Sequence, residues 1–480
     1  MNKIDYEKVR LKCGLEIHQQ LDTKKLFCNC QSILRKDEPD FRVERKLHAV
    51  VGESGKIDKA AEYQSNLNKS FIYEGYDSNC LIELDEEPPH QINQETLKIA
   101  VQISLLLNAK IIPITQMMRK TVIDGSNTSG FQRTVMIAYD GFIETKEGKV
   151  RIDTICLEED AARKISEEKD KVVYRLDRLG IPLIEIATAP DIKTPEQAKE
   201  TALKLGDILR SCKVKRGIGT IRQDVNVSIK GSNRVEIKGF QNPAMMIKTI
   251  NNEIIRQQEI IKSKKNKPEV RNSLPDGTTE FLRPMPGEAR MYPETDLPLL
   301  KISREFINES KKTLPKLRSE IERDLNKKGL SQELVKMLFK QNKLEKFKSL
   351  IHFTKNLNLI GKMILVFPKD IAKREKISNE KINEILSDEI FEFILNAVRE
   401  KKISEKQIKQ IMEKVVRGEE PEKAIIFEKK DIGDIEEKIM KIIKDKHGLS
   451  DKAYMGLVMK EFRGQIDGKT AMEIIKKHVR

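Results

Sequence analysis

The stretch Gly219–Phe240 reads GTIRQDVNVSIKGSNRVEIKGF, and apolar and polar residues alternate in it twice. Because successive side chains of a strand point to opposite faces of a sheet, this alternation predicts two strands, each with an apolar and a polar face. The intervening KGSN (Lys230–Asn233) is typical of a hairpin turn. The polar face carries Arg222, Asp224, Asn226, Ser228, Arg234, Glu236 and Lys238. The stretch therefore predicts a strand pair that displays charge on one side.

The same alternation recurs in KCGLEIHQQL (12–21), TICLEEDA (154–161) and IPLIEIAT (181–188). Helices are predicted over 94–107 and from Thr194, as N-cap, to about residue 212. This mixture predicts an α+β domain built on an antiparallel or mixed sheet.

Two further regions of the chain differ in composition from this one. The stretch 264–298 is rich in proline, glycine and charge, which predicts a long irregular connection. After residue 300, apolar residues recur at helical spacing, so the last 180 residues are predicted to be all-helical. We expect a catalytic cradle over 1–300, a helical domain over 301–410 and a small helical tail over 411–480.

The chain carries a net charge of +15, and the excess lies mainly at one end. Residues 301–480 hold 42 basic and 30 acidic side chains, a surplus of 12. Such a polarised surplus favours a nucleic-acid partner, although a Lys-rich, well-solvated helical surface gives the same composition.

Length and composition exclude several classes of protein. A chain of 480 residues is too long for one hydrophobic core, and 34% charged with 38% hydrophobic residues is typical of a soluble globular protein. Neither a signal peptide nor a membrane span is recognisable, so we expect a cytoplasmic protein. The six cysteines lack the spacing of a disulfide framework and are expected to be reduced.

Ionisable residues on the polar faces of the predicted strands suggest a metal site. They are Glu16, His18, Glu158 and Glu185. A carboxylate among apolar neighbours is costly to bury without a partner, and a set of glutamates with one imidazole suits Mg²⁺ or Mn²⁺. Strand parity prefers Glu158 over its neighbour Glu159. The alternative is an ordinary solvated sheet face.

A dense loop of hydroxyl, amide and glycine residues follows Asp124. Its members are Ser126, Asn127, Thr128, Ser129 and Gly130, with Arg133 close behind. Backbone N–H groups of such a loop can hold a phosphate or the end of a nucleic acid, but loops of this composition are also plain turns.

Two other motifs carry weaker signals. Cys28 and Cys30 in FCNC are either half of a zinc site or part of a structural turn. The segment 464–470 (GQIDGKT) is similar to a phosphate-binding loop, but it is one residue too short and follows a predicted helix. A helix-turn-helix that presents Lys460, Arg463 and Lys469 to nucleic acid is the better interpretation.

Seven segments in order carry a family resemblance. They are GLEIHQQLDTKKLFCNC (14–30), IDGSNTSGFQRT (123–134), LEEDAAR (157–163), LGIPLIEIATAPDI (179–192), RGIGTIRQDVNVSI (216–229), FLRPMPGEARMYPETDLPLL (281–300) and VMKEFRGQIDGKTAMEIIKK (458–477). Together they resemble the B/E subunit family of tRNA-dependent amidotransferases, and within it the archaeal E branch. The resemblance implies a cradle domain, a helical domain and a tRNA-interacting tail.

The resemblance also implies a reaction. Members of this family are carbon–nitrogen ligases that use ATP and Mg²⁺ to phosphorylate the γ-carboxylate of glutamate on misacylated tRNA(Gln). Ammonia then displaces the phosphate and leaves glutaminyl-tRNA(Gln). A separate asparaginase-like partner, the D subunit, would supply the ammonia through a channel, in a heterotetramer with two copies of each protein. This chain shows no nucleophile motif that could release ammonia by itself.

Residue roles follow from the resemblance in the same way. It implies Glu16, His18, Glu158 and Glu185 as Mg²⁺ ligands. Arg222 and Lys238 would contact phosphate or carboxylate, and Asp224 and Asn226 would orient the substrate or a metal ligand. The loop residues Ser126, Asn127, Thr128, Ser129 and Arg133 would lie near the tRNA acceptor end, and Lys460, Arg463 and Lys469 would contact the tRNA body.

One departure from the family pattern concerns an insert. Members of the E branch usually carry a large insert similar to a domain of bacterial aspartyl-tRNA synthetase, whereas here only a short Lys-rich stretch separates Arg256 from Glu269. Two competing functions share the same features. A tRNA-binding scaffold would keep the fold without the chemistry, and a metal-dependent nuclease would combine carboxylates with basic charge.

Overall fold

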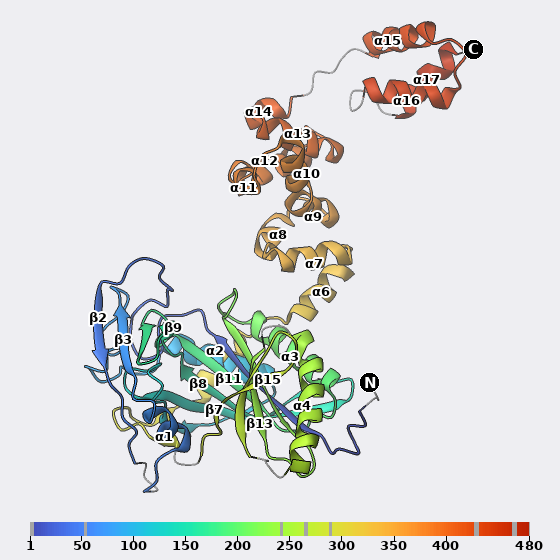
Figure 1. Cartoon of the computed structure of the whole chain (residues 1–480). Helices are drawn as coiled ribbons and strands as arrows, with labels where there is room; N and C mark the ends of the chain where they lie inside the picture. Colours follow the sequence, from blue (N-terminus) through green and yellow to red (C-terminus); the bar gives the residue numbers. More distant parts are fainter. Residues whose placement is uncertain are drawn as a thin grey trace. The chain divides into compact units, whose positions relative to one another are not determined.

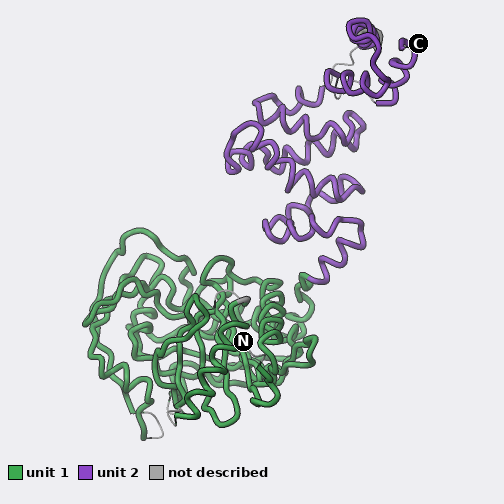
Figure 2. The backbone as a smooth tube through the Cα atoms, turned by 45° about the vertical axis from the view of Figure 1, so that its right-hand side comes forward, with its two compact units in different colours: residues 1–318 green, residues 319–480 purple. Residues whose placement is uncertain are grey.

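The computed structural model describes residues 4–51, 55–240, 243–263, 267–287, 290–426, 432–462 and 468–479. The chain forms two compact units, residues 1–318 and 319–480 (Figure 2). Each unit is described separately below. Within the described ranges, no helix combines the length and the apolar character needed to cross a membrane.

A mixed sheet of eleven described strands dominates the first unit (Figure 1). The strands, in spatial order, are β15 (Thr279–Pro284), β14 (Glu269–Ser273), β13 (Val235–Phe240), β12 (Ile221–Ser228), β1 (Lys12–Gln20), β11 (Pro182–Thr188), β8 (Gly148–Glu159), β7 (Phe131–Thr145), β6 (Met118–Thr121) and β16 (Met291–Pro293), with β4 (Lys110–Ile111) beside β7. All pairs are antiparallel except β13–β14, which is parallel. The α+β prediction and the predicted hairpin between β12 and β13 are confirmed.

Three helices pack on one face of this sheet: α2 (Gln94–Leu106), α3 (Pro195–Ser211) and α4 (Pro243–Ser263). Figure 1 shows α3 and α4 side by side along the sheet. The largest core lies between these helices and the alternate apolar residues of the strands, such as Ile17 and Ile186, which are fully buried. The polar residues of the same strands therefore point to the opposite face.

The start of α3 confirms the predicted cap and refines it. The Thr194 hydroxyl accepts a hydrogen bond of 3.1 Å from the backbone N–H of Gln197, and Pro195 occupies the first helical position. The Gln197 side chain accepts from the backbone N–H of Lys193 at 2.8 Å, one residue before the N-cap. Two otherwise unpaired donors are thus satisfied, as in a capping box, with a shift of one residue.

The predicted irregular connection over 264–298 is wrong in its described part. Strands β14, β15 and β16 extend the main sheet at both edges. The local sequence does not reveal β14 and β16 because their pairing is long-range: β14 pairs with β13 across the whole of α4, and β16 pairs with β6. The hairpin partner of β14 is β15. Ion pairs of Glu269 with Arg256, at 2.9 Å, and with Arg271, at 3.0 Å, fix the start of β14.

Smaller elements complete the first unit. They are β2 (Phe41–Arg45), β3 (Ser70–Gly75), β10 (Lys171–Arg175) and β9 (Arg163–Glu167) in a four-stranded sheet, the pair β17 (Leu300–Lys301) and β5 (Ile114–Thr115), and the helices α1 (Lys59–Ser65) and α5 (Arg304–Lys312). The four-stranded sheet has its own small core, which includes Tyr73 and Tyr174.

The regular secondary structure of the second unit is entirely helical among its described residues, as predicted. Its helices are α6 (Arg318–Lys327, beginning at the unit boundary), α7 (Gln332–Lys340), α8 (Leu344–Leu350), α9 (Leu357–Leu365), α10 (Phe367–Glu375), α11 (Asn379–Ile385), α12 (Asp388–Arg399), a 3₁₀ turn (Glu405–Gln407), α13 (Ile408–Val416), α14 (Pro421–Ala424), α15 (Ile432–Asp445), α16 (Asp451–Glu461) and α17 (Gly468–His478). One core runs from Leu325 to Ala424 and another from Ile435 to Ile475. The predicted boundary at 300 falls before α5, which packs on α2, and the one at 410 falls inside α13. The three-domain division stays a prediction.

Candidate functional site

The polar face of the main sheet forms one wall of a cleft of about 470 Å³. Strands β1, β8, β11, β12 and β13 contribute charged side chains to it, and the segment around β15 and β16 contributes Arg283 and Arg290. The cleft contains two groups of possible metal ligands, each with its ligand atoms within 4.8 Å of one another. We call them the His18 cluster (His18, Glu158, Glu185) and the Glu16 cluster (Glu16, Asp224, Glu236).

The His18 cluster spans three neighbouring strands. His18 of β1 is directly opposite Glu185 of β11, and its Nε2 lies 3.6 Å from the Glu185 carboxylate. Glu158 enters from β8, which pairs with β11 on the other side. The Lys120 ammonium bridges the two carboxylates, in contact with Glu158 and 3.2 Å from Glu185. A positive charge thus already sits where the two glutamates converge.

Burial and neighbouring charges shift the pKa values of Glu158 and Glu185 in opposite directions. Burial, together with the Glu185 charge, raises the pKa of Glu158. Burial acts the same way on Glu185, but Lys120 and His18 outweigh it and hold the pKa of Glu185 well below its ordinary value. Burial lowers the pKa of His18, and the hydrogen bond and charge of Glu185 more than reverse this effect, so the net shift is upward. Glu185 is therefore the anionic centre of the cluster.

The Glu16 cluster lies beside it on β1, β12 and β13. Glu16 is directly opposite Asp224, and Asn226 donates a 2.9 Å hydrogen bond to the Glu16 carboxylate. The Lys238 ammonium lies 2.8 Å from Asp224 and also contacts Glu236. Burial and the Glu236 and Glu185 charges raise the pKa of Glu16. This cluster therefore concentrates three carboxylates around one lysine.

The four predicted metal ligands do not form a single group. Three of them meet in the His18 cluster, whereas Glu16 lies with Asp224 and Glu236. Residues two apart on a strand share a face but are about 6.6 Å apart along it, so Glu16 and His18 point at different parts of the cleft. The ligand assignments themselves stay predictions.

Arg222 also lines the cleft, at its Asp160 end. Its guanidinium donates a 2.7 Å hydrogen bond to Asp160, which also accepts 2.6 Å from the amide of Gln20. Asp160 is buried, so it fixes one side of the guanidinium while 38% of the Arg222 side chain remains exposed. A cation held in this way is available to an anionic substrate.

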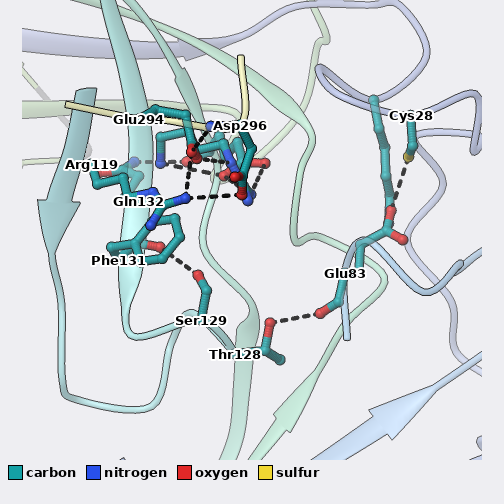
Figure 3. Close-up of polar contacts among 12 residues, drawn as sticks. Cys28, Glu83, Arg119, Thr128, Ser129, Phe131, Gln132, Glu294 and Asp296 are labelled. Carbon is teal, nitrogen blue, oxygen red and sulfur yellow. Dashed lines mark hydrogen bonds and ion pairs between the residues drawn. The ribbon is translucent and has the colours of Figure 1, made fainter. Parts of the chain in front are cut away.

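Glu159, the neighbour of Glu158, points away from the cleft. It faces Arg133, whose guanidinium lies 3.5 Å from it and 2.8 Å from the fully buried Glu294. Figure 3 shows Glu294 also held by Arg119. Arg133 is buried within this ion network, although the sequence predicted it near the tRNA acceptor end.

The loop after Asp124 is bonded within the protein. The Thr128 hydroxyl donates to the carbonyl of Glu83 at 2.7 Å, and the Ser129 hydroxyl donates to that of Phe131 at 3.0 Å (Figure 3). Ser126 donates to Asp124 at 2.6 Å through its hydroxyl. Asn127 is buried beside a cavity of only about 10 Å³. None of these side chains lines the large cleft, so their role at the acceptor end stays a prediction.

A third group of possible ligands contains Cys28, Cys30, Cys80 and Glu83. The Cys28 thiol donates to the Glu83 carboxylate at 3.2 Å, and the buried Lys25 ammonium lies 2.8 Å from the same carboxylate (Figure 3). Burial is the main factor that raises the pKa of Cys80 to about 12. The fold thus brings Cys80 to the FCNC motif, and three thiols with one carboxylate form a donor set that zinc accepts.

The predicted tail residues lie on two helices. Lys460 of α16 lines a groove of about 890 Å³ between α15 and α16, together with Lys438, Lys441 and Lys446. Ile442, Leu457 and Phe462 form its apolar part. Lys469 is an exposed residue of α17, and Arg463 lies outside the described residues.

Six charged residues of the cleft were missing from the predicted site: Lys120, Asp160, Arg234, Glu236, Arg283 and Arg290. Strand parity placed Glu236 on the polar face, so that signal was present in the sequence. Lys120 follows no long alternating run, and Arg283 and Arg290 lie in the stretch predicted to be irregular. The pairing of β6 with β7 and β16 brings Lys120 and Arg290 to the cleft, and the pairing of β15 with β14 brings Arg283.

Two family models together match most of the chain. Residues 11–308 match the model of the GatB/GatE catalytic domain, and residues 345–479 match that of the GatB domain. The chain is 37% identical to the E subunit of glutamyl-tRNA(Gln) amidotransferase from Methanocaldococcus jannaschii, with 100% of both chains covered. The proteins of the same name in Methanosarcina barkeri and Sulfurisphaera tokodaii are 35% and 33% identical, each with 100% of this chain and at least 99% of the relative covered.

The alignment with the M. jannaschii protein also bears on the predicted absence of an insert. It extends over 637 positions, whereas this chain has 480 residues, so at least 157 positions are occupied by the relative alone. This difference agrees with the prediction that a large insert is missing here.

Proposed function

Because the chain belongs to the GatB/GatE family, we propose that it is the component of a tRNA-dependent amidotransferase that converts glutamyl-tRNA(Gln) to glutaminyl-tRNA(Gln). In the proposed reaction, the γ-carboxylate of the glutamate attacks the γ-phosphorus of ATP, and ADP leaves. Ammonia then attacks the activated acyl carbon, and inorganic phosphate leaves. The observation that best supports this chemistry is the cleft with two carboxylate clusters on the sheet face opposite the helices.

The residues of both clusters fit Mg²⁺. Carboxylate oxygens dominate each set, and Mg²⁺ prefers oxygen ligands. The Oδ1 atom of Asn226, next to Glu16, is buried without a hydrogen-bond partner among the described residues, so an oxygen ligand is available there. Bound Mg²⁺ would neutralise negative charge on the phosphates of ATP. His18, Glu158 and Glu185 would hold one ion, and Glu16, Asp224 and Glu236 would hold a second.

The cations of the cleft would position the substrate's anionic groups and stabilise their negative charge. Lys238, between Asp224 and Glu236, and Arg222, held by Asp160, present fixed positive groups along one wall. Phosphoryl transfer requires little covalent chemistry from the protein, and such preorganised charges stabilise the negative charge that develops in the transition state. We assign Arg222 and Lys238 to the transferred phosphate and to the glutamate carboxylate.

The word "subunit" in the names of the relatives points to an enzyme built from several chains. We propose that an asparaginase-like partner, the D subunit, releases ammonia and delivers it to this chain in a heterotetramer. The division of labour requires only that this chain bind ATP, Mg²⁺ and the charged tRNA.

A coupled assay tests the proposed function. Glutamyl-tRNA(Gln), ATP, Mg²⁺ and ammonium are supplied to the full chain with its partner, and ADP and glutaminyl-tRNA are measured. We expect both products, and ADP formation should depend on the charged tRNA. Cleavage of the RNA without ATP consumption would instead show a nuclease. Tight tRNA binding with no product would show a non-catalytic scaffold.

Removal of the tail is expected to affect tRNA binding more than turnover. The lysine-lined groove is formed by α15 and α16, which share the core from Ile435 to Ile475. Helices α13 and α14 belong to the core that ends at Ala424, so the deletion should start after Ile426. Because lysines near phosphates contribute mainly electrostatic affinity, we expect KM for glutamyl-tRNA(Gln) to rise about 10- to 100-fold with a smaller change in kcat. Steady-state kinetics at several salt concentrations measures both. An unchanged KM would contradict the role of the tail.

A further inference from the structure

Six lysine and arginine side chains line the cleft, and they fall into two classes. Lys120, Lys238 and Arg222 each contact a carboxylate. Arg234, Arg283 and Arg290 do not: among the described residues, no carboxylate oxygen lies within 4.0 Å of their guanidinium nitrogens. The second class therefore has donors to offer to a ligand.

Arg283 and Arg290 are the partly buried members of this class, whereas Arg234 is exposed. The hydrogen bond recorded for Arg290 runs from Nε to the carbonyl of Thr121 at 3.4 Å, out of five N–H donors. Burial, followed by the charge of Arg290, lowers the pKa of Arg283. Three weaker carboxylate charges offset this shift only in part, those of Glu236, Asp124 and Asp58. Two neighbouring cations that are partly removed from water are unfavourable unless an anion joins them.

The fold places each arginine near one carboxylate cluster. Met291 of β16 is directly opposite Lys120 of β6, so Arg290 enters the cleft beside the lysine of the His18 cluster. Arg283, at the end of β15, is near enough to Glu236 of the Glu16 cluster to interact with its charge. The backbone N–H of Gly287 donates a 2.9 Å hydrogen bond to Asp58, which fixes the chain shortly after β15.

We propose that Arg283 and Arg290 form a phosphate-binding wall of the cleft, which takes the polyphosphate chain of a nucleotide. The wall and the two carboxylate clusters line the same 470 Å³ cleft, a volume typical of small-ligand sites. A chain of phosphates can accept hydrogen bonds from guanidinium groups on one side. On the other side it can coordinate metal ions that carboxylates hold. The identity of the nucleotide rests on the proposed function. Phosphodiesters of the tRNA acceptor end carry the same phosphate oxygens and could also bind these arginines.

Binding of inorganic tripolyphosphate to the full chain in the presence of Mg²⁺ tests the wall without turnover. The variants are Arg283→Gln, Arg290→Gln and the double substitution, measured by calorimetry. Since each arginine would contribute charge-assisted hydrogen bonds, we expect Kd to rise about tenfold or more for each single variant and about 100-fold for the double one. Arg151→Gln is the control, because that guanidinium is paired with Asp191 at 2.8 Å outside the cleft. A Kd equal to that of the unsubstituted chain would overturn the proposal.

A second arm uses a short RNA hairpin with a single-stranded acceptor end. If the wall binds a nucleotide, the affinity of the arginine variants for this RNA should stay within about twofold of that of the unsubstituted chain. Loss of RNA binding with intact tripolyphosphate binding would overturn the nucleotide assignment. Loss of both would support a wall that binds phosphates of both ligands. Because these assays need neither ammonia nor partner, the wall and the proposed function can fail separately.

Thermal denaturation separates a ligand-binding role from a structural one. Because neither guanidinium forms an ion pair with a carboxylate of the described residues, the Tm of both single variants should stay close to that of the unsubstituted chain. A fall in Tm similar to that of a core substitution would show that the arginines hold the fold together, and would overturn the proposal.

Discussion

Glu185→Gln is expected to lower ATP-dependent phosphorylation of glutamyl-tRNA(Gln) by at least about 10²- to 10³-fold, with tRNA affinity changed by less than about twofold. Glu185 is the carboxylate on which the His18 cluster converges, since it contacts both His18 and Lys120. Glutamine keeps the size of the side chain but removes its charge, so Mg²⁺ would lose its main anionic ligand in this cluster. The negative charge that develops on the phosphates would then lose the cation that stabilises it. The cleft belongs to the first unit, whereas the lysines of the tail groove belong to the second unit.

Single-turnover ADP formation measures the effect, and filter binding measures the tRNA affinity. Glu144→Gln is the matched control, because Glu144 is an exposed residue of β7, paired only loosely with Lys149 at 3.7 Å. We expect this control to behave like the unsubstituted chain. If Glu185→Gln loses tRNA binding while phosphorylation persists, the assignment of the cleft to chemistry is wrong.

The central strands could be predicted from the sequence because one face of the sheet is buried completely. Ile17, Ile186 and Val225 are each fully buried, and a shift of one residue would expose all of them. The alternation therefore fixes both the strands and the side that carries charge. By contrast, β14 and β16 have partners separated from them by a helix or by much of the chain, and no local pattern encodes such pairing.

For the site, the sequence could predict only which face of its own strand each side chain occupies. Parity placed Glu16, His18, Glu158 and Glu185 on one face, which the structure confirms, but it contains no information about which strands are neighbours. The order β12–β1–β11–β8 decides that Glu185 meets His18 and that Asp224 meets Glu16. Lys120 could not be found in this way, because β6 is short and reaches the cleft only through its partner β7.

The last prediction concerns that lysine. Lys120→Met is expected to destabilise the metal-free protein by about 3–5 kcal/mol, because the buried carboxylates of Glu158 and Glu185 would lose the cation between them. The same substitution should tighten Mn²⁺ binding about tenfold or more, since a bound divalent ion would no longer be repelled by the ammonium group. The prediction is that, in the unsubstituted chain, the lysine and a divalent ion would compete for the same pair of oxygens.

Chemical denaturation with EDTA and with Mn²⁺ measures the stability, and electron paramagnetic resonance of Mn²⁺ measures the affinity. Lys204→Met on α3 is the control, because its 3.0 Å pair with Glu200 is an i,i+4 pair with both side chains partly exposed and should contribute less than about 1 kcal/mol. Since an ion that binds only the folded state stabilises it, Mn²⁺ should restore most of the lost stability in Lys120→Met. An unchanged Mn²⁺ affinity would mean that the lysine and the metal occupy different places, and that Lys120 acts on the substrate rather than on the ion.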